Sequence, residues 1–142
     1  ENILFGNPDA RDEEIFNISK ITGVDVIASE LQGGFSATLN EGGSSLSGGQ
    51  KQAICLTRTL LNDSKILLMD EPTSSMDTQT EGVFITNLKN LIKDKTVVIA
   101  THKGRVLNIV DRVIVLDNGR IVADGKKNDI LRPAAAKVQS IK

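Results

Sequence analysis

The sequence predicts an α/β fold in which parallel strands alternate with helices. Two apolar runs, at residues 66–69 and 96–100, have the length of buried strands, and polar residues follow each run directly. Between them, apolar residues recur at the spacing of one helix face: Phe84, Ile85, Leu88, Leu91 and Ile92. A strand, helix, strand order implies a parallel crossover. We expect residues 66–69 to form a strand that is buried on both faces and residues 96–100 to form a second buried strand.

Composition limits the classes of function. The chain has 142 residues, of which 39% are hydrophobic and 25% charged, as in one soluble globular domain. Its 17 Lys and Arg against 18 Asp and Glu give a net charge of -1, so no polybasic surface indicates nucleic acid or an anionic membrane. Trp and Tyr are absent, which leaves few platforms for stacking bases. We therefore expect no nucleic-acid partner.

The single cysteine, Cys55, lies among apolar residues, and we expect it to be buried and structural in a reducing compartment. No apolar run approaches the roughly 20 residues of a membrane-spanning helix. The chain starts at Glu1 without an initiating Met, so we expect it to be part of a longer protein.

Two short helices are expected before the first strand. Isoleucines recur at helical spacing in residues 13–21, and residues 24–31 form a second short segment between glycine breaks. Residues 35–45 are rich in Gly and Ser, with Glu41 in their middle, and predict a surface loop.

The run Leu46-Ser47-Gly48-Gly49-Gln50 predicts a capped helix, because Ser47 and Gln50 have the spacing of a capping box. A helix N-terminus offers unpaired N–H groups, and paired glycines let a phosphate approach them. Helix caps are common, however, so the run alone is equally compatible with a plain capped helix.

Acidic and polar side chains follow the two strands. Asp70 can hold Mg²⁺ directly or through water, and Glu71 can accept a proton from a water that attacks a phosphoryl group. His102 lies at the end of the second strand, and the carboxyl ends of parallel strands meet at one edge. Each residue taken alone also fits a structural role, and Asp77 fits the first turn of a helix.

A hairpin is expected near the C-terminus. Residues 113–117 and 120–124 flank Asn118-Gly119, which is the strongest short-range hairpin signal. Residues 128–131 predict a helical turn. Residues 133–142 predict a tail, and residues 134–142 are equally compatible with the start of another helix.

No stretch of the chain fits G-x-x-x-x-G-K-[ST], the loop that holds nucleotide phosphates. The one Gly-Lys pair, Gly125-Lys126, has Arg120 in place of the first glycine and Lys127 in place of Ser or Thr.

Taken together, the order and spacing of these motifs resemble the ATP-binding cassette (ABC) ATPase domain over nearly the whole chain. The resemblance implies a partial P-loop NTPase-like ABC ATPase fold without the Walker A half. In that family's terms Glu71 is the catalytic carboxylate and His102 the switch histidine. The remaining motifs are the signature motif, Leu46, Ser47, Gly48, Gly49 and Gln50; the Walker B strand, residues 66–70; and the D-loop, Ser75, Met76 and Asp77.

Softer similarities indicate a subfamily. Residues 1–6 and 40–43 look like the exporter class, in which an acidic loop, here at Glu41, lies near the coupling helices of the membrane domain. Asn40 stands where Gly is usual, and Lys51-Gln52-Ala53 departs from the usual Arg-Gln-Arg. Residues 101–125 are similar to bacterial type I secretion exporters of peptides and proteins.

The resemblance implies a mechanism. Two ATPase domains, expected as a homodimer, pack head to tail, and the signature residues of one bind ATP carried by the other. Asp70, holding Mg²⁺ through water, acts with Glu71 and His102 on ATP bound by the same chain. The implied cofactors are ATP and Mg²⁺. The other implied partner is the transmembrane domain of the same transporter, which places the chain at the cytoplasmic face of the bacterial inner membrane.

The implied division is a helical signature subdomain at residues 1–64, the C-terminal part of the catalytic core at 65–132 and a tail at 133–142. Lacking Walker A, the chain alone is expected to be inactive, to expose apolar surface and to self-associate. Two alternatives remain: an SMC-type chromosome-maintenance ATPase head, which predicts heptads before the signature, and a truncated, non-catalytic interaction module.

Overall fold

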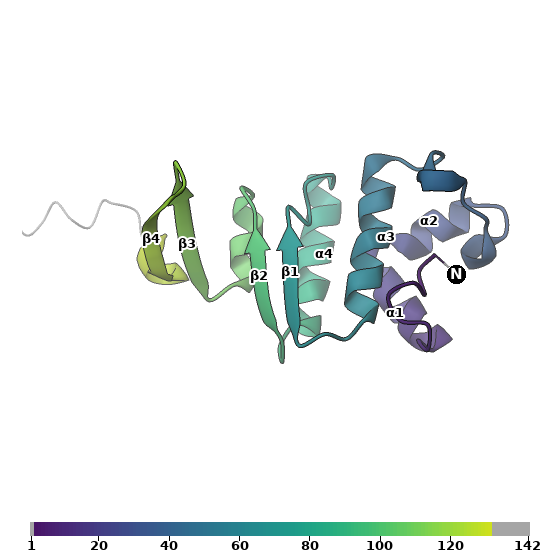
Figure 1. Cartoon of the computed structure of the whole chain (residues 1–142), viewed down its shortest axis with the longest axis horizontal. Coiled ribbons are helices and arrows are strands. Elements are labelled where there is room, and N and C mark those ends of the chain that lie inside the picture. Colours follow the sequence, from purple (N-terminus) through teal and green to yellow (C-terminus); the bar gives the residue numbers. More distant parts are fainter. Residues whose placement is uncertain (1, 132–142) are drawn as a thin grey trace, which may run out of the picture. The chain divides into compact units, whose positions relative to one another are not determined.

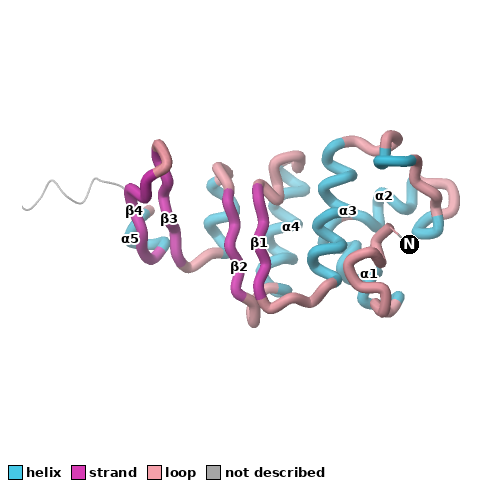
Figure 2. The backbone as a smooth tube through the Cα atoms, in the orientation of Figure 1, coloured by secondary structure: helices cyan, strands magenta, loops and turns pink. Residues whose placement is uncertain are grey.

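The computed structural model describes residues 2–131, which fall into two compact units (Figures 1 and 2). The first unit is Glu1–His102 and the second is Lys103–Lys142. The tail expected at residues 133–142 lies outside the described residues. Among the helices that are described, none combines the length and apolar character needed to cross a membrane.

Three helices form the N-terminal part of the first unit. They are α1 (Asp12–Thr22), α2 (Val24–Glu30) and α3 (Gly48–Leu61), and α1 contacts both of the others. Gly23 joins α1 to α2 in the left-handed region, with φ at 80°, which glycine adopts without a steric penalty. Both short helices expected from the sequence are confirmed.

The connection from α2 to α3 is irregular, as expected. It contains two single 3₁₀ turns, η1 (Gly34–Ser36) and η2 (Glu41–Gly43), and ends at the buried Leu46. Leu46 packs in an apolar cluster with Val24, Ala53 and Ile54. This cluster fixes the start of α3 against α2.

Two parallel strands follow α3 along the chain. In register, β1 (Ile66–Asp70) pairs with β2 (Thr96–Ala100), and α4 (Thr78–Leu91) is the crossover helix between them. The inward face of α4 contributes Phe84 and Leu88, which are among the most deeply buried side chains. The predicted parallel crossover is confirmed.

The predicted burial of the strand at residues 66–69 on both faces was wrong, as was the predicted burial of the strand at residues 96–100. In β1, Leu67 and Met69 are buried, whereas Ile66 and Leu68 are 62% and 73% exposed; in β2, Val98 is 57% exposed. A crossover helix covers one face of a sheet, and no element among residues 2–131 covers these three side chains. The expectation that the chain exposes apolar surface is thereby confirmed.

The burial predicted for Cys55 was also wrong, because its side chain is exposed. Its helical neighbours one turn away, Lys51 and Thr59, are exposed as well, whereas Ile54 and Leu56 are buried. Cys55 therefore lies on the outward face of α3. Its apolar neighbours in the sequence had suggested burial.

The second unit is built on the predicted hairpin. After η3 (Gly104–Ile109), β3 (Arg112–Asp117) pairs antiparallel with β4 (Arg120–Lys126). The turn residues Asn118 and Gly119 have φ of 47° and 73°, as a type I′ turn requires. The short helix α5 (Lys127–Ile130) follows, so the expected terminal helical turn is confirmed.

Candidate functional site

The N-terminus of α3 carries the glycine pair. Ser47 is the N-cap residue, and its Oγ accepts a hydrogen bond from the N–H of Gln50 at 3.2 Å. In return Oε1 of Gln50 accepts from the N–H of Ser47 at 2.9 Å, so the predicted capping box is formed. A Cβ added to Gly48 would meet no atom within 4 Å. The backbone of the first turn is thus open to an approaching anion.

The same turn lies close to the loop after β1. A Cβ built on Gly49 would come within 3.3 Å of the carbonyl oxygen of Ser75. The run from Leu46 to Gln50 and the run from Ser75 to Asp77 therefore meet in one place, although 75 − 50 = 25 to 77 − 46 = 31 positions separate their residues along the chain. Asp77 then starts α4, where its Oδ1 accepts from the N–H groups of Gln79 and Thr80 at 2.9 and 3.0 Å.

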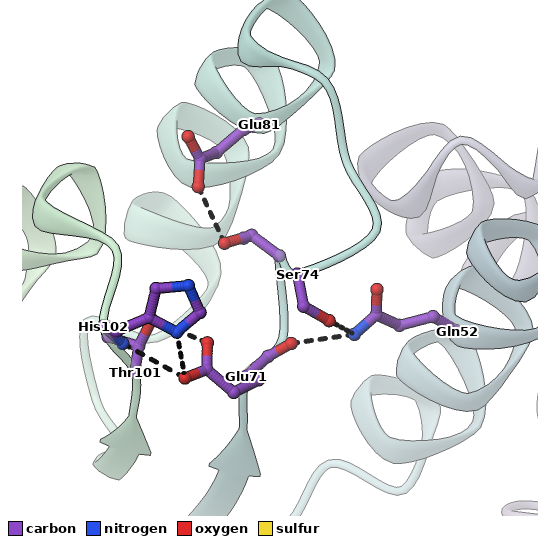
Figure 3. A network of polar contacts seen from close by, with 7 residues as sticks. Gln52, Glu71, Ser74, Glu81, Thr101 and His102 are labelled. Carbon is purple, nitrogen blue, oxygen red and sulfur yellow. Dashed lines mark hydrogen bonds and ion pairs between the residues drawn. The ribbon is translucent and has the colours of Figure 1, made fainter.

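Glu71 directly follows β1, and its N–H still donates to the carbonyl of Ala100 at 2.9 Å. Its carboxylate faces the residues after β2 (Figure 3). Oε2 accepts from the Thr101 hydroxyl at 3.1 Å, and Oε1 accepts from the His102 N–H at 3.1 Å. Nδ1 of His102 lies 2.6 Å from the same Oε1. The two strand ends are thus joined through one carboxylate.

The surroundings of Glu71 favour its ionised form. The hydrogen bond from the His102 side chain, helped by that from Thr101 and opposed by partial loss of solvent, lowers the pKa of Glu71 below its ordinary value. The side chain of Glu71 is 33% exposed and that of His102 is 76% exposed. An ionised carboxylate beside an accessible imidazole can accept a proton from a bound water.

The loop from Glu71 to Asp77 is held from two sides (Figure 3). From α3, Gln52 donates to the carbonyl of Glu71 at 2.8 Å. From α4, the buried Glu81 accepts from the hydroxyl of Thr73, which is also buried, at 2.8 Å. Neither Gln52 nor Glu81 was singled out from the sequence. Glu81 could have been found, because it is an acid on the apolar face of α4.

The other sequence-predicted residues have simpler surroundings. Asp70 ends β1 with its side chain exposed, in register with Ala100. Glu41 is exposed and begins η2, and the half-buried Met76 donates its N–H to the carbonyl of Thr73 at 3.0 Å.

A parallel crossover with an acid pair at the end of β1, a histidine after β2 and a glycine-rich capped helix defines a partial ABC ATPase fold. The sequence profile described as "ABC transporter" matches residues 4–74, which is 71 of the 142 residues. The chain therefore belongs to the ABC transporter family.

Individual relatives are named as ABC transporter or translocation ATP-binding proteins. The chain is 42% identical over 131 residues to the uncharacterized ABC transporter ATP-binding protein YknV of Bacillus subtilis, covering 92% of this chain and 22% of that protein. It is 37% identical over 131 residues to the alpha-hemolysin translocation ATP-binding protein HlyB of Escherichia coli, covering 92% of this chain and 18% of that protein.

Among solved structures, a bacterial Atm1-family ABC exporter with ATP bound matches with a TM-score of 0.81 and 29% identity. The match covers 99% of this chain and 26% of the exporter chain. The chain thus spans about a fifth to a quarter of the length of these relatives.

Proposed function

We propose that the chain is the C-terminal part of the ATP-hydrolysing domain of an ABC exporter, which couples ATP binding and hydrolysis to export of a peptide or protein. The observation that carries the proposal is the contact between Glu71 and His102 at the two strand ends, with Nδ1 and Oε1 2.6 Å apart. Similarity to HlyB, named as an alpha-hemolysin translocation protein, supports a polypeptide cargo.

In this proposal two ATPase domains, here as a homodimer, pack head to tail around two ATP molecules. Leu46 anchors the start of α3, and the first turn at Ser47, Gly48 and Gly49 binds the γ-phosphate of the partner's ATP. The capping box with Gln50 keeps the first turn in helical geometry, so its N–H groups and the positive end of the helix dipole face that phosphate.

Glu71 and His102 act on ATP held by the same protein chain. The ionised Glu71 accepts a proton from the attacking water as the water oxygen bonds to the γ-phosphorus and ADP leaves. His102 contacts the γ-phosphate and the water through its exposed ring, while Thr101 helps to keep the carboxylate in place.

The side chains present can hold Mg²⁺ only together with the phosphates of ATP. Among the described residues no group of three or more His, Cys, Asp or Glu side chains could hold a metal ion. Mg²⁺ is commonly held by one or two carboxylates together with substrate phosphates and waters, and the exposed Asp70 supplies such a carboxylate. When bound, the ion would neutralise charge on the phosphates.

The remaining residues are assigned to contacts with partners. Ser75, Met76 and Asp77 form the loop that faces the second ATPase domain. Glu41 lies in the loop that meets the transmembrane domain, so the chain works at the cytoplasmic face of the membrane. The corresponding division is a helical subdomain at 1–64, the C-terminal part of the catalytic core at 65–132 and a tail at 133–142. Helix α1 contacts α4 across the first of these boundaries.

The proposal is tested in the intact protein with Glu71→Gln. Loss of the general base should lower ATP turnover by about 10²- to 10⁴-fold, while ATP-induced pairing of the domains persists. Glu30→Gln, at an exposed position ending α2, serves as the matched control. Normal turnover in Glu71→Gln would place the base elsewhere. The purified 142 residues alone should show no appreciable hydrolysis, because a P-loop supplies most phosphate contacts in this reaction class.

A further inference from the structure

We propose that Gln52 is a positioning residue, which ties α3 to the loop after β1 and thereby holds the Glu71 carboxylate against Thr101 and His102. Its consequence for turnover rests on the function proposed above. The positioning itself is a property of the ligand-free chain.

The side-chain amide of Gln52 uses both of its ends. Nε2 donates to the carbonyl of Glu71 at 2.8 Å and to Oγ of Ser74 at 3.1 Å. Oε1 accepts from the N–H of Ser75 at 3.2 Å. Figure 3 shows this amide reaching the loop from α3, on the side of Glu71 away from His102. One side chain therefore contacts the loop at Glu71, Ser74 and Ser75.

Glu71 needs such a hold because of its backbone. Its φ is +44°, in the left-handed region that non-glycine residues seldom adopt. A residue in this region persists only when its surroundings fix it. The N–H of Glu71 is held by Ala100 in β2, and its carbonyl accepts from the Gln52 amide at 2.8 Å and from the N–H of Ser74 at 3.1 Å. Loss of the Gln52 amide would leave this carbonyl with only the longer of these two bonds, from the Ser74 N–H, and would loosen the backbone at Glu71.

A shift of the backbone at Glu71 would move the side chain of the same residue. The carboxylate meets the His102 N–H at 3.1 Å and Nδ1 of His102 at 2.6 Å, distances that a small shift would disrupt. Gln52 does not itself touch His102 in any of these contacts. Glu71 contacts both Gln52 and His102, so we expect an effect of Gln52 on His102 to pass through Glu71.

Two substitutions in the intact protein distinguish the role of the Gln52 amide nitrogen from that of its oxygen. Gln52→Glu is isosteric and keeps an acceptor for the Ser75 N–H, but it loses the donor to the Glu71 carbonyl. Gln52→Leu loses both. Gln32→Leu makes the same change at an exposed glutamine in the turn after α2 and is the control.

The first readout is hydrogen–deuterium exchange without nucleotide, followed by mass spectrometry. We expect the peptide with the His102 N–H to exchange severalfold faster in both Gln52 variants. The peptide with the Ser75 N–H should exchange faster only in Gln52→Leu, and Gln32→Leu should match the wild type. If Gln52→Leu fails to fold, Gln52→Glu still decides the result.

The second readout is ATP turnover. We expect kcat to fall about 10- to 100-fold in both Gln52 variants while KM for ATP stays within about threefold, since the geometry of the base changes and nucleotide binding does not. Wild-type exchange at His102 and wild-type kcat in Gln52→Glu would overturn the inference. Normal turnover in Glu71→Gln would instead overturn the proposed function, and the exchange result at His102 would still decide the role of Gln52.

Discussion

The cap of α3 allows a quantitative prediction for Ser47→Ala. The substitution removes the Oγ that accepts from the N–H of Gln50 at 3.2 Å. Replacing a serine N-cap by alanine costs about 1 kcal/mol, within a range of roughly 0.5–2. The reciprocal bond, from the Ser47 N–H to Gln50, uses the backbone and can survive, so we expect about 1 kcal/mol, or about a fivefold increase in local opening of the first turn.

The assay is hydrogen–deuterium exchange of the intact protein without nucleotide, on peptides that span the first turn of α3. Ser47→Ala should speed exchange there about fivefold and leave the middle of the helix unchanged. Ser47→Thr, which retains a capping hydroxyl, should stay close to the wild type. Gln50→Ala removes the other half of the box and should give a smaller increase.

The reasoning is wrong if Ser47→Ala exchanges as slowly as the wild type, or if Ser47→Thr is as fast as Ser47→Ala. The ATP-free condition matters, because Ser47 is also proposed to bind phosphate. A variant that loses ATP-induced pairing without any change in exchange would show a role for the hydroxyl in binding alone.

Two further predictions concern burial. Thr73→Val removes the hydroxyl that donates to the buried carboxylate of Glu81 at 2.8 Å. The substitution should lower the free energy of unfolding, measured by denaturant titration, by about 1.5–3 kcal/mol. The control is Thr86→Val, whose exposed hydroxyl bonds within its own helix, and an equal or smaller loss in Thr73→Val than in this control would refute the prediction. Leu68→Lys places a charge among the exposed apolar side chains of β1 and β2, through which the purified 142 residues are expected to self-associate. The variant should therefore show a lower mass in light scattering than the wild type. A monomeric wild type would contradict that expectation.

Features specified by local sequence were predicted well. The capping box of Ser47 and Gln50 and the turn at Asn118-Gly119 depend on residues within a few positions of one another. The crossover between residues 66–70 and 96–100 was predicted because its apolar periodicity changes from strand to helix and back. The contact of Glu71 with His102 followed from the rule that parallel strand ends share one edge.

Features that depend on distant packing were missed. An apolar run such as residues 66–69 does not reveal whether both faces are covered, and Leu68 proved exposed. Cys55 has apolar neighbours along the chain, but α3 turns it away from them. Gln52 reaches a loop 19 residues further along, and no spacing within α3 indicates that bond.

The two pairs of strands also differ in the length of chain that must close before they can form. In the hairpin the innermost partners are Asp117 and Arg120, 120 − 117 = 3 positions apart. In the parallel pair, Ile66 meets Thr96, 96 − 66 = 30 positions apart. A hairpin forms in about 1–10 μs, whereas pairing across a long loop costs closure entropy before any contact offsets it. We therefore expect β3 and β4 to pair early during folding. The edge that brings Glu71 to His102 should assemble late, only after α4 has shortened the path between its strands.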